Sequence, residues 1–201
     1  QRAEMAQALK AGILMFNVES HDELVALNET ALSVGAVAPI SLRVNPDVDP
    51  VTHPYLATGL RKSKFGIPIA RAFDEYLFAK TLSGIAIVGI DCHIGSQLTT
   101  TAPFVDAISK VSSFVERLAV AGILIRYFDV GGGLGITYDA EQPPHPSDYA
   151  GEVRRALDDC IVTSSCAGTT LVFEPGRVLV GNAGVLLTRV LYLKENEAKR
   201  F

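Results

Sequence analysis

The sequence predicts an α/β fold with a parallel sheet, in the form of a (β/α)8 TIM-type barrel of which only a part is present. Five short apolar segments with strand-like composition recur along the 201 residues, and stretches of helical periodicity separate them. This alternation is typical of right-handed βαβ units, whose strands are parallel. The predicted strands cover residues 13–18, 39–44, 85–91, 125–128 and 170–173.

Polar residues at the end of every predicted strand favour a barrel over an open sheet. These residues are Glu19, Arg43–Asn45, His93–Ser96, Gly131–Gly133 and Glu174–Arg177. In an open doubly wound sheet only the strands at the switch point carry ligand groups, whereas a barrel gathers every strand end around one axis. A complete barrel has eight strands, so we expect about five of the eight here.

Helical periodicity predicts five helices in the same region. The first covers residues 2–11, and the second begins at Ser20, which stands three residues before a glutamate in the spacing of a capping box. The third covers residues 70–81, and the fifth covers residues 149–161. The fourth has Pro103 in its first turn, a favoured position for proline. Its apolar stripe consists of Phe104, Ile108, Val111, Val115 and Leu118.

Two segments interrupt the alternation. Residues 47–67 form a polar stretch that is too long for a simple connection, and we expect a functional loop there. From residue 178 to 193 the chain is almost continuously apolar without a helical stripe, which predicts β structure outside the parallel sheet. We therefore divide the chain into a barrel segment, residues 1–177, and the start of a C-terminal β-domain, residues 178–201.

Composition excludes several classes of protein. A hydrophobic content of 48% indicates a globular domain, and a net charge of −4 without a basic stripe argues against a nucleic-acid partner. No apolar stretch is long enough to span a bilayer and the N-terminal residues do not resemble a signal peptide, so we expect a cytoplasmic protein without a membrane partner. Cys92, Cys160 and Cys166 lack metal-type spacing, and we expect reduced thiols and no metal.

Three of the predicted strand ends carry groups suited to chemistry. The first has the imidazole of His93 and the hydroxyl of Ser96. The second is the glycine run Gly131–Gly133, whose N–H groups could approach a phosphate closely, although it could also be a tight turn without a ligand. The third, residues 174–177, adds a carboxylate and a guanidinium. Together these groups suit a phosphorylated ligand that contains a flat ring.

Each of these side chains also has a purely structural interpretation. Glu174 ends an apolar strand, and it could either pair with Arg177 or hold a protonated ring nitrogen. Arg177 suits bidentate recognition of a phosphate or a carboxylate. His93 could be a packed histidine or a ring laid over a flat ligand, with Ser96 donating to a phosphate. Arg43 could reach the same centre or only bridge neighbouring strands.

The motifs resemble those of the fold-type III pyridoxal-phosphate decarboxylases. The resemblance covers practically the whole chain, and within the family it is to the branch that decarboxylates meso-diaminopimelate to L-lysine and CO₂. The ornithine and arginine decarboxylases share only the skeleton of the pattern. The segments that carry the resemblance are Phe16–Ser20, Arg43–Val48, Thr52–Tyr55, Thr58–Leu60, Lys64–Ile67 and His93–Gln97.

The resemblance implies an eight-stranded barrel joined to a C-terminal β-domain, in a homodimer with active sites between the subunits. It implies that His93 stacks on the ring of pyridoxal 5′-phosphate and that Glu174 pairs with the ring nitrogen, both as catalytic residues. Arg177 would also face a carboxylate of the substrate, meso-diaminopimelate. The candidate cofactor-binding residues are Arg43, His93, Ser96, Gly131, Gly132, Gly133, Glu174, Pro175, Gly176 and Arg177.

One residue of the family pattern has no counterpart in the sequence. The family's catalytic lysine lies in an early strand in a Tyr-Ala-x-Lys-Ala-Asn-like setting, and none of the seven lysines has that context. We therefore expect a partial chain that does not turn over substrate by itself. Two alternatives stay open: a non-catalytic domain that binds pyridoxal phosphate or a protein partner, and a related decarboxylase of the ornithine or arginine type.

Overall fold

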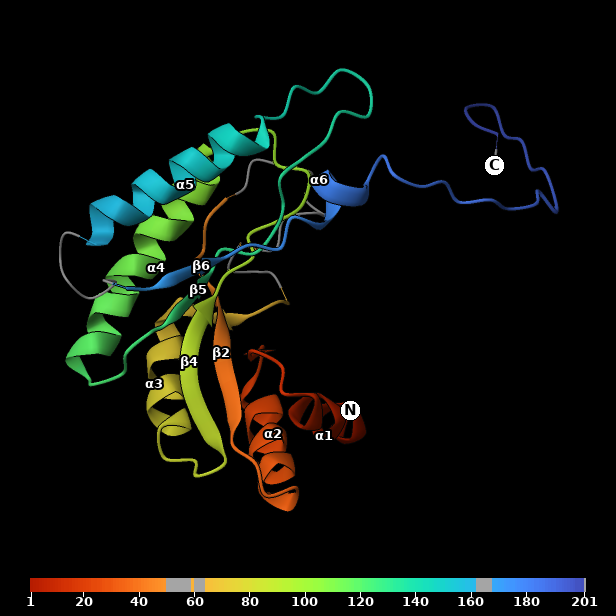
Figure 1. The fold of residues 1–201 in the computed structure, drawn as a ribbon. Coiled ribbons are helices and arrows are strands. Elements are labelled where there is room, and N and C mark those ends of the chain that lie inside the picture. The colour runs from red at the N-terminus through yellow and green to blue at the C-terminus, as the bar shows by residue number, and fades with distance from the viewer. Residues whose placement is uncertain (50–58, 60–63, 162–167, 201) are drawn as a thin grey trace.

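Strands and helices alternate along the chain in the computed structural model (Figure 1). The structure describes residues 1–49, 59, 64–161 and 168–200. The side chains of residues 159–161 are not described. The described helices are α1 (Arg2–Ala11), α2 (His21–Ser33), α3 (Ile69–Ala79), α4 (Ala102–Val120), α5 (Pro146–Ile161) and α6 (Gly176–Val180). The described strands are β1 (Phe16–Val18), β2 (Ala38–Asn45), β3 (Ile67–Pro68), β4 (Ile85–Asp91), β5 (Tyr127–Asp129) and β6 (Thr170–Val172).

The main sheet is parallel, and its strands follow one another in chain order, β1-β2-β4-β5-β6. The short strand β3 pairs with β2 outside this path. Helices α3, α4 and α5 lie along the outside of the curved sheet (Figure 1). A sheet that adds each new strand at the same edge, with a helix between strands, is the repeating unit of a barrel. The predicted α/β class and the five strands of a partial barrel are therefore confirmed.

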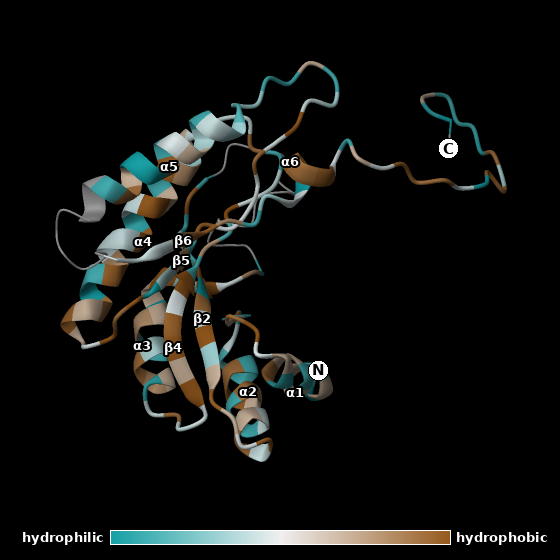
Figure 2. Cartoon of the chain, in the orientation of Figure 1, coloured by the Kyte–Doolittle hydropathy of each residue, from teal (hydrophilic) through white to brown (hydrophobic). Residues whose placement is uncertain are grey.

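The core lies between the sheet and these helices. In β2 the alternate residues Ile40, Leu42 and Val44 are at most 1% exposed and belong to the hydrophobic core. The residues between them point to the opposite, concave face because successive side chains of a strand alternate. In Figure 2 β4 is largely apolar, whereas β2 alternates between apolar and polar residues, as expected for a strand with helices on one face and charged side chains on the other.

The sequence predicted the helices well, with small shifts at their ends. Ser20 caps α2, because its side chain accepts a hydrogen bond from the N–H of Glu23 at 3.2 Å. The predicted stripe of α4 is buried, from Phe104 to Leu118. The predicted loop 47–67 falls largely outside the described residues, but its last residue, Ile67, lies in β3.

The prediction of β structure over residues 178–193 is wrong. Its first residues lie in α6, and the described chain that follows contains no strand up to residue 193. Figure 1 shows this segment running away from the barrel, and the side chains of Val185, Leu186 and Leu187 are more than 90% exposed. A strand needs a backbone partner, and apolar composition does not supply one.

Membrane-spanning helices are absent from the described part of the chain, because no helix there has both the length and the apolar character that a span requires.

Candidate functional site

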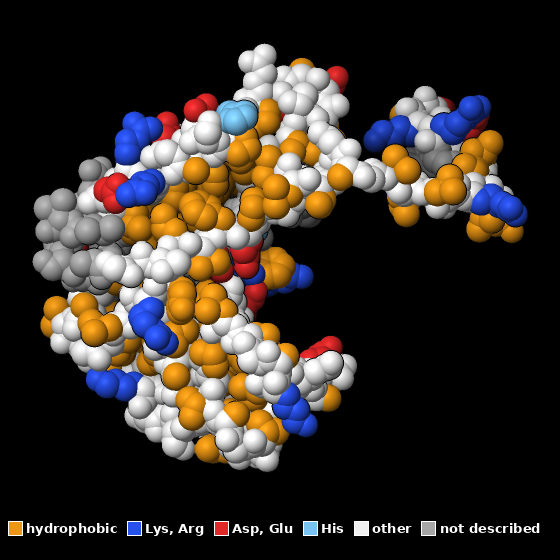
Figure 3. All heavy atoms as spheres, in the orientation of Figure 1, with side chains coloured by type: hydrophobic (Ala, Val, Ile, Leu, Met, Phe, Trp, Pro, Cys, Tyr) orange, Lys and Arg blue, Asp and Glu red, His pale blue; other side chains and the backbone are white. Residues whose placement is uncertain are grey.

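A row of charged side chains crosses the carboxyl ends of the strands. The parallel register pairs Arg43 of β2 with Asp91 of β4, and Asp91 with Asp129 of β5. Residues in register on parallel strands point to the same face, so these three side chains share the concave face. Figure 3 shows the molecule hollowed on one side, with acidic side chains gathered in the hollow.

Backbone hydrogen bonds join the three motifs into one unit. The N–H of Cys92 donates to the carbonyl of Asp129 at 3.0 Å, and the N–H of Glu174 donates to the carbonyl of Gly131 at 2.9 Å. On the other side of the glycine run, the N–H of Leu98 donates to the carbonyl of Gly133 at 2.9 Å. The segments that follow β4, β5 and β6 therefore lie against one another.

The close approach of these segments requires glycine at residues 131–133. A Cβ atom on Gly132 would lie 2.2 Å from the carbonyl oxygen of Glu174, and one on Gly133 would lie 2.4 Å from that of Gly95. Gly131 has a φ of 68°, and its N–H donates to the Asp129 carboxylate at 2.9 Å. Only glycine fits all three positions without displacing the backbone.

His93 lies at the centre of the site. Its Nδ1 accepts a hydrogen bond from the N–H of Gly132 at 3.2 Å, so the ring is neutral with its proton on Nε2. Burial and the nearby Arg43 lower the pKa of His93, which agrees with a neutral ring. The Nδ1 atom is also 3.9 Å from Oε2 of Glu174, but a neutral imidazole forms no ion pair there.

Glu174 does not pair with Arg177, which was one of the two interpretations from sequence. Its carboxylate lies beside His93 and remains 47% exposed. Partial burial and the Asp129 carboxylate raise the pKa of Glu174. A cationic group beside it would relieve both effects, so this carboxylate suits a protonated ring nitrogen.

Arg177 is held by two hydroxyl groups instead. One terminal nitrogen donates to Oγ of Ser96 at 2.8 Å, and the other donates to the hydroxyl of Tyr138. Its Nε is buried and has no hydrogen-bond partner in the described part of the chain. A guanidinium with only neutral partners and an unpaired N–H fits an anionic ligand such as a phosphate.

Arg43 bridges strands, in line with the structural interpretation of this residue. Its guanidinium pairs with the carboxylate of Glu19, and its Nε lies 4.0 Å from Oδ2 of Asp91. Asp91 is buried, and its Oδ1 has no partner among the described residues. Burial, and then the Asp129 carboxylate, raise the pKa of Asp91 well above its ordinary range.

Pro175 and Gly176 connect Glu174 to Arg177. Pro175 precedes α6, and the N–H of Gly176 donates to the carbonyl of Glu174 at 2.8 Å. No atom lies within 4 Å of the position where Gly176 would carry a Cβ, so packing does not require this glycine.

Sequence reasoning missed three residues of the site. Asp129 could have been found from the Asp-x-Gly spacing, in which the carboxylate accepts from the N–H two residues on. Asp91 carries the same signal as Glu174, a carboxylate at the end of an apolar strand. Tyr138 lies 39 residues from its partner Arg177, and no local pattern marks it.

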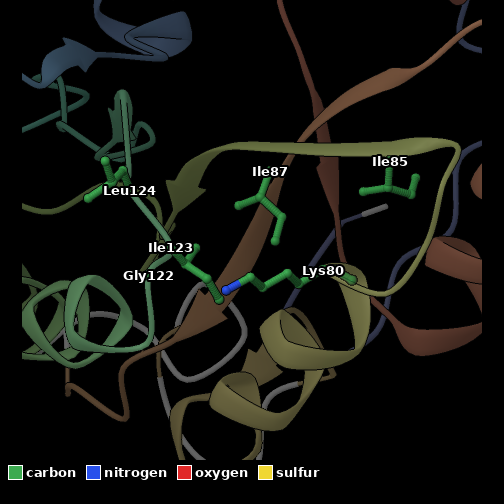
Figure 4. A pocket seen from close by; sticks show the side chains of 7 residues that line it. Lys80, Ile85, Ile87, Gly122, Ile123 and Leu124 are labelled. Atoms are coloured by element: carbon green, nitrogen blue, oxygen red, sulfur yellow. The ribbon is translucent and has the colours of Figure 1, made fainter.

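A separate cavity of about 210 Å³ lies away from these residues. It is near the beginning of β4, and its lining includes Ile85, Ile87 and Ile123 (Figure 4). Lys80 reaches across it, but its Nζ donates to the carbonyl of Ala121 at the end of α4. This cavity has a mixed lining and does not contain the polar groups described above.

The half-open parallel barrel, with a glycine turn, a guanidinium and a carboxylate at its strand ends, has the chemistry of a domain that binds a flat, phosphorylated ligand. Residues 1–181 match the family described as pyridoxal-dependent decarboxylase, pyridoxal binding domain. The chain belongs to this family of enzymes.

Several relatives are diaminopimelate decarboxylases. The enzyme of Pseudomonas aeruginosa is 52% identical over 200 residues, which are 100% of this chain and 46% of the relative. The solved structure of the Helicobacter pylori enzyme complexed with L-lysine is 41% identical with a TM-score of 0.84, and the match covers 100% of this chain and 48% of that one. The M. jannaschii enzyme in complex with L-lysine is 38% identical with a TM-score of 0.83, covering 100% and 46%. The chain therefore spans about half the length of the relatives it matches.

Proposed function

We propose that this chain is the cofactor-binding part of a diaminopimelate decarboxylase, which converts meso-diaminopimelate to L-lysine and CO₂ with pyridoxal 5′-phosphate. The observation that carries the proposal is the meeting of three distant motifs at His93, whose Nδ1 lies 3.2 Å from the N–H nitrogen of Gly132 and 3.9 Å from the Glu174 carboxylate. The identity of 52% to a diaminopimelate decarboxylase supports the substrate.

The residues present fit the cofactor at both of its ends. At the phosphate end, Arg177 has a buried Nε without a partner in the described part of the chain, and its guanidinium donates to the Ser96 hydroxyl. The Gly131–Gly133 turn is joined to Glu174 and Leu98 by backbone hydrogen bonds. At the ring end, Glu174 is a carboxylate without a cationic partner in the described part of the chain, because His93 is neutral. The site thus offers a carboxylate to the protonated ring nitrogen and a guanidinium to the phosphate.

The cofactor, when bound, supplies an electron-poor ring that accepts the electron pair left behind when CO₂ departs. Glu174 would hold the proton on the ring nitrogen through a charge-assisted hydrogen bond, and this proton would keep the ring electron-poor. His93 would lie against the ring and exclude water from it. Because its imidazole is neutral, it adds no second positive charge that would weaken the hold of Glu174.

The proposal includes a homodimer in the cytoplasm and a domain boundary near residue 178, all of which rest on the family resemblance. The apolar side chains exposed between Val185 and Leu193 support the boundary, because a further domain would cover them. Arg177 is the candidate residue for binding a substrate carboxylate. Arg43 is a candidate cofactor-binding residue, and we expect its positive charge to act from a greater distance.

The two alternatives make different predictions for one assay. The protein translated from the complete reading frame that contains these residues is supplied with pyridoxal phosphate, and CO₂ release is measured with meso-diaminopimelate, ornithine and arginine. We expect CO₂ and L-lysine from meso-diaminopimelate only. Release mainly from ornithine or arginine would identify a related decarboxylase, and cofactor binding without any CO₂ would identify a non-catalytic domain.

A further inference from the structure

We propose that Tyr138 is an anion-binding residue of this site, and that its hydroxyl, the Ser96 hydroxyl and the Arg177 guanidinium together form one seat for a phosphate or carboxylate group. The inference deepens the proposed function and rests on it. It adds a residue from the segment after the glycine run, which neither the motifs nor the family resemblance had marked.

The hydrogen bonds of Arg177 leave the hydroxyl hydrogen of Tyr138 available to a ligand. A guanidinium only donates, so both hydroxyl oxygens must accept when they bond to Arg177. The Tyr138 oxygen thus has its own hydrogen left to donate, and that hydrogen has no acceptor among the described residues. The phenol is therefore available as a donor to an anion that binds beside Arg177.

The charge of the cluster points to the same class of ligand. No carboxylate in the described part of the chain pairs with Arg177, and its Nε is buried without a partner. A partly buried cation whose neighbours are neutral and whose buried N–H has no acceptor is stabilised when an anion binds beside it. A phosphate or carboxylate oxygen accepts only, so it complements the guanidinium and the phenol together.

The backbone on the N-terminal side of Tyr138 is fixed by Gln97. The Gln97 amide donates to the carbonyl of Ile136 at 2.5 Å and accepts from the N–H of Ile136 at 3.1 Å. Gln97 itself has a φ of 60°, a left-handed conformation that costs a non-glycine residue energy. In this conformation the Gln97 side chain makes two hydrogen bonds to the backbone of Ile136, two residues before Tyr138.

The backbone on the C-terminal side is fixed by Glu141. Its carboxylate accepts from the N–H of Tyr138 at 3.0 Å and from the N–H of Asp139 at 2.8 Å. The Tyr138 ring centroid also lies 5.7 Å from Cζ of Arg177, within the range of a cation–π contact. The side chain is nevertheless 62% exposed, so a ligand can reach the hydroxyl.

The test compares Tyr138→Phe, which keeps the ring and removes the hydroxyl, with the matched control Tyr192→Phe. Tyr192 is 89% exposed and lies far along the chain in the segment after α6. Dissociation constants are measured by equilibrium dialysis for pyridoxal phosphate and for pyridoxal, which lacks the phosphate, using the protein from the complete reading frame. The KM for meso-diaminopimelate is measured on the same variants.

If the seat holds the cofactor phosphate, Tyr138→Phe raises the dissociation constant for pyridoxal phosphate about tenfold and leaves that for pyridoxal unchanged. If it holds the substrate carboxylate, the KM rises by a similar factor and cofactor affinity does not change. Tyr192→Phe is expected to change neither. The inference is overturned if Tyr138→Phe behaves like Tyr192→Phe in all of these measurements.

Failure of the proposed function would be recognised separately, because the unsubstituted protein would then not bind pyridoxal phosphate. In that case inorganic phosphate serves as the probe, and its binding is followed by the ³¹P NMR shift. Weaker phosphate binding in Tyr138→Phe than in the unsubstituted protein would still support the seat, and equal binding would overturn it.

Discussion

The Nδ1 atom of His93 lies 3.2 Å from the backbone nitrogen of Gly132, although 39 residues separate the two in the chain. This hydrogen bond links the end of β4 to the turn after β5, and it determines which nitrogen of the imidazole carries the proton. It also means that protonation of His93 must break a contact between two parts of the site.

Acidification should therefore weaken the fold through His93. Its pKa is lowered below the ordinary 6.5, so the neutral form stabilises the folded state at neutral pH, and this stability is lost as the pH falls through the lowered pKa. The variant His93→Asn keeps an acceptor near the same place but does not titrate. Urea unfolding between about pH 5 and pH 7 should show a steeper loss of unfolding free energy in the unsubstituted protein than in the variant. Equal slopes would contradict the assignment.

Replacing Glu174 by glutamine should increase stability and decrease activity. The raised pKa indicates a carboxylate that the site disfavours without a cation, so Glu174→Gln should raise the unfolding free energy at neutral pH. The gain should be less than about 1 kcal/mol because the side chain is 47% exposed. In the protein from the complete reading frame, kcat should fall by about 100-fold. A variant that keeps full activity would exclude Glu174 as the partner of the ring nitrogen.

Asp91 should be a destabilising residue when ionised. Its pKa is raised well above the ordinary 3.8, so the folded state loses stability as the pH rises through that raised value. Asp91→Asn removes the charge at nearly constant size, and we expect about 1–3 kcal/mol more stability at pH 8 than in the unsubstituted protein. The advantage should shrink toward about pH 4, where the unsubstituted carboxyl is protonated in the folded state. Chemical unfolding at the two pH values measures the difference.

The glycine run should tolerate no side chain at its centre. In Gly132→Ala the new Cβ would lie 2.2 Å from the carbonyl oxygen of Glu174, so we expect a loss of more than about 2 kcal/mol. Gly151→Ala is the control, because it lies in α5 with no atom within 4 Å of the new Cβ, and it should stabilise by about 0.5–1 kcal/mol. Thermal unfolding of both variants tests the pair. A Gly132→Ala protein as stable as the parent would mean that the motifs pack less closely than described.

Borohydride reduction tests the prediction about lysine. None of the seven lysines of the 201-residue chain has the context of the family's catalytic lysine. We expect that reduction in the presence of pyridoxal phosphate leaves no adduct at a single preferred lysine of this chain, whereas the protein from the complete reading frame acquires one. Peptide mapping by mass spectrometry locates any adduct. One stoichiometric adduct within these residues would contradict the prediction.

The sequence by itself determined the five strands of the main sheet, the first five helices and the positions of the three motifs. The strand predicted for residues 85–91 is β4, and the stripe of α4 is buried as its spacing indicated. Both properties depend on the period of apolar residues within one segment, which is local information. Parallel strands meet at one edge, so the convergence of His93 and Glu174 also followed from their positions at strand ends.

Only the tertiary structure decided which of these groups pair with each other. Arg177 bonds to Ser96 and Tyr138, which are 81 and 39 residues away, and not to Glu174, which is three residues away. Residues 182–193 have the composition of a strand but form none, because in Figure 1 their backbone runs away from the sheet. Packing between distant segments determines which groups form hydrogen bonds with each other. The local sequence pattern that forms each segment does not contain this information.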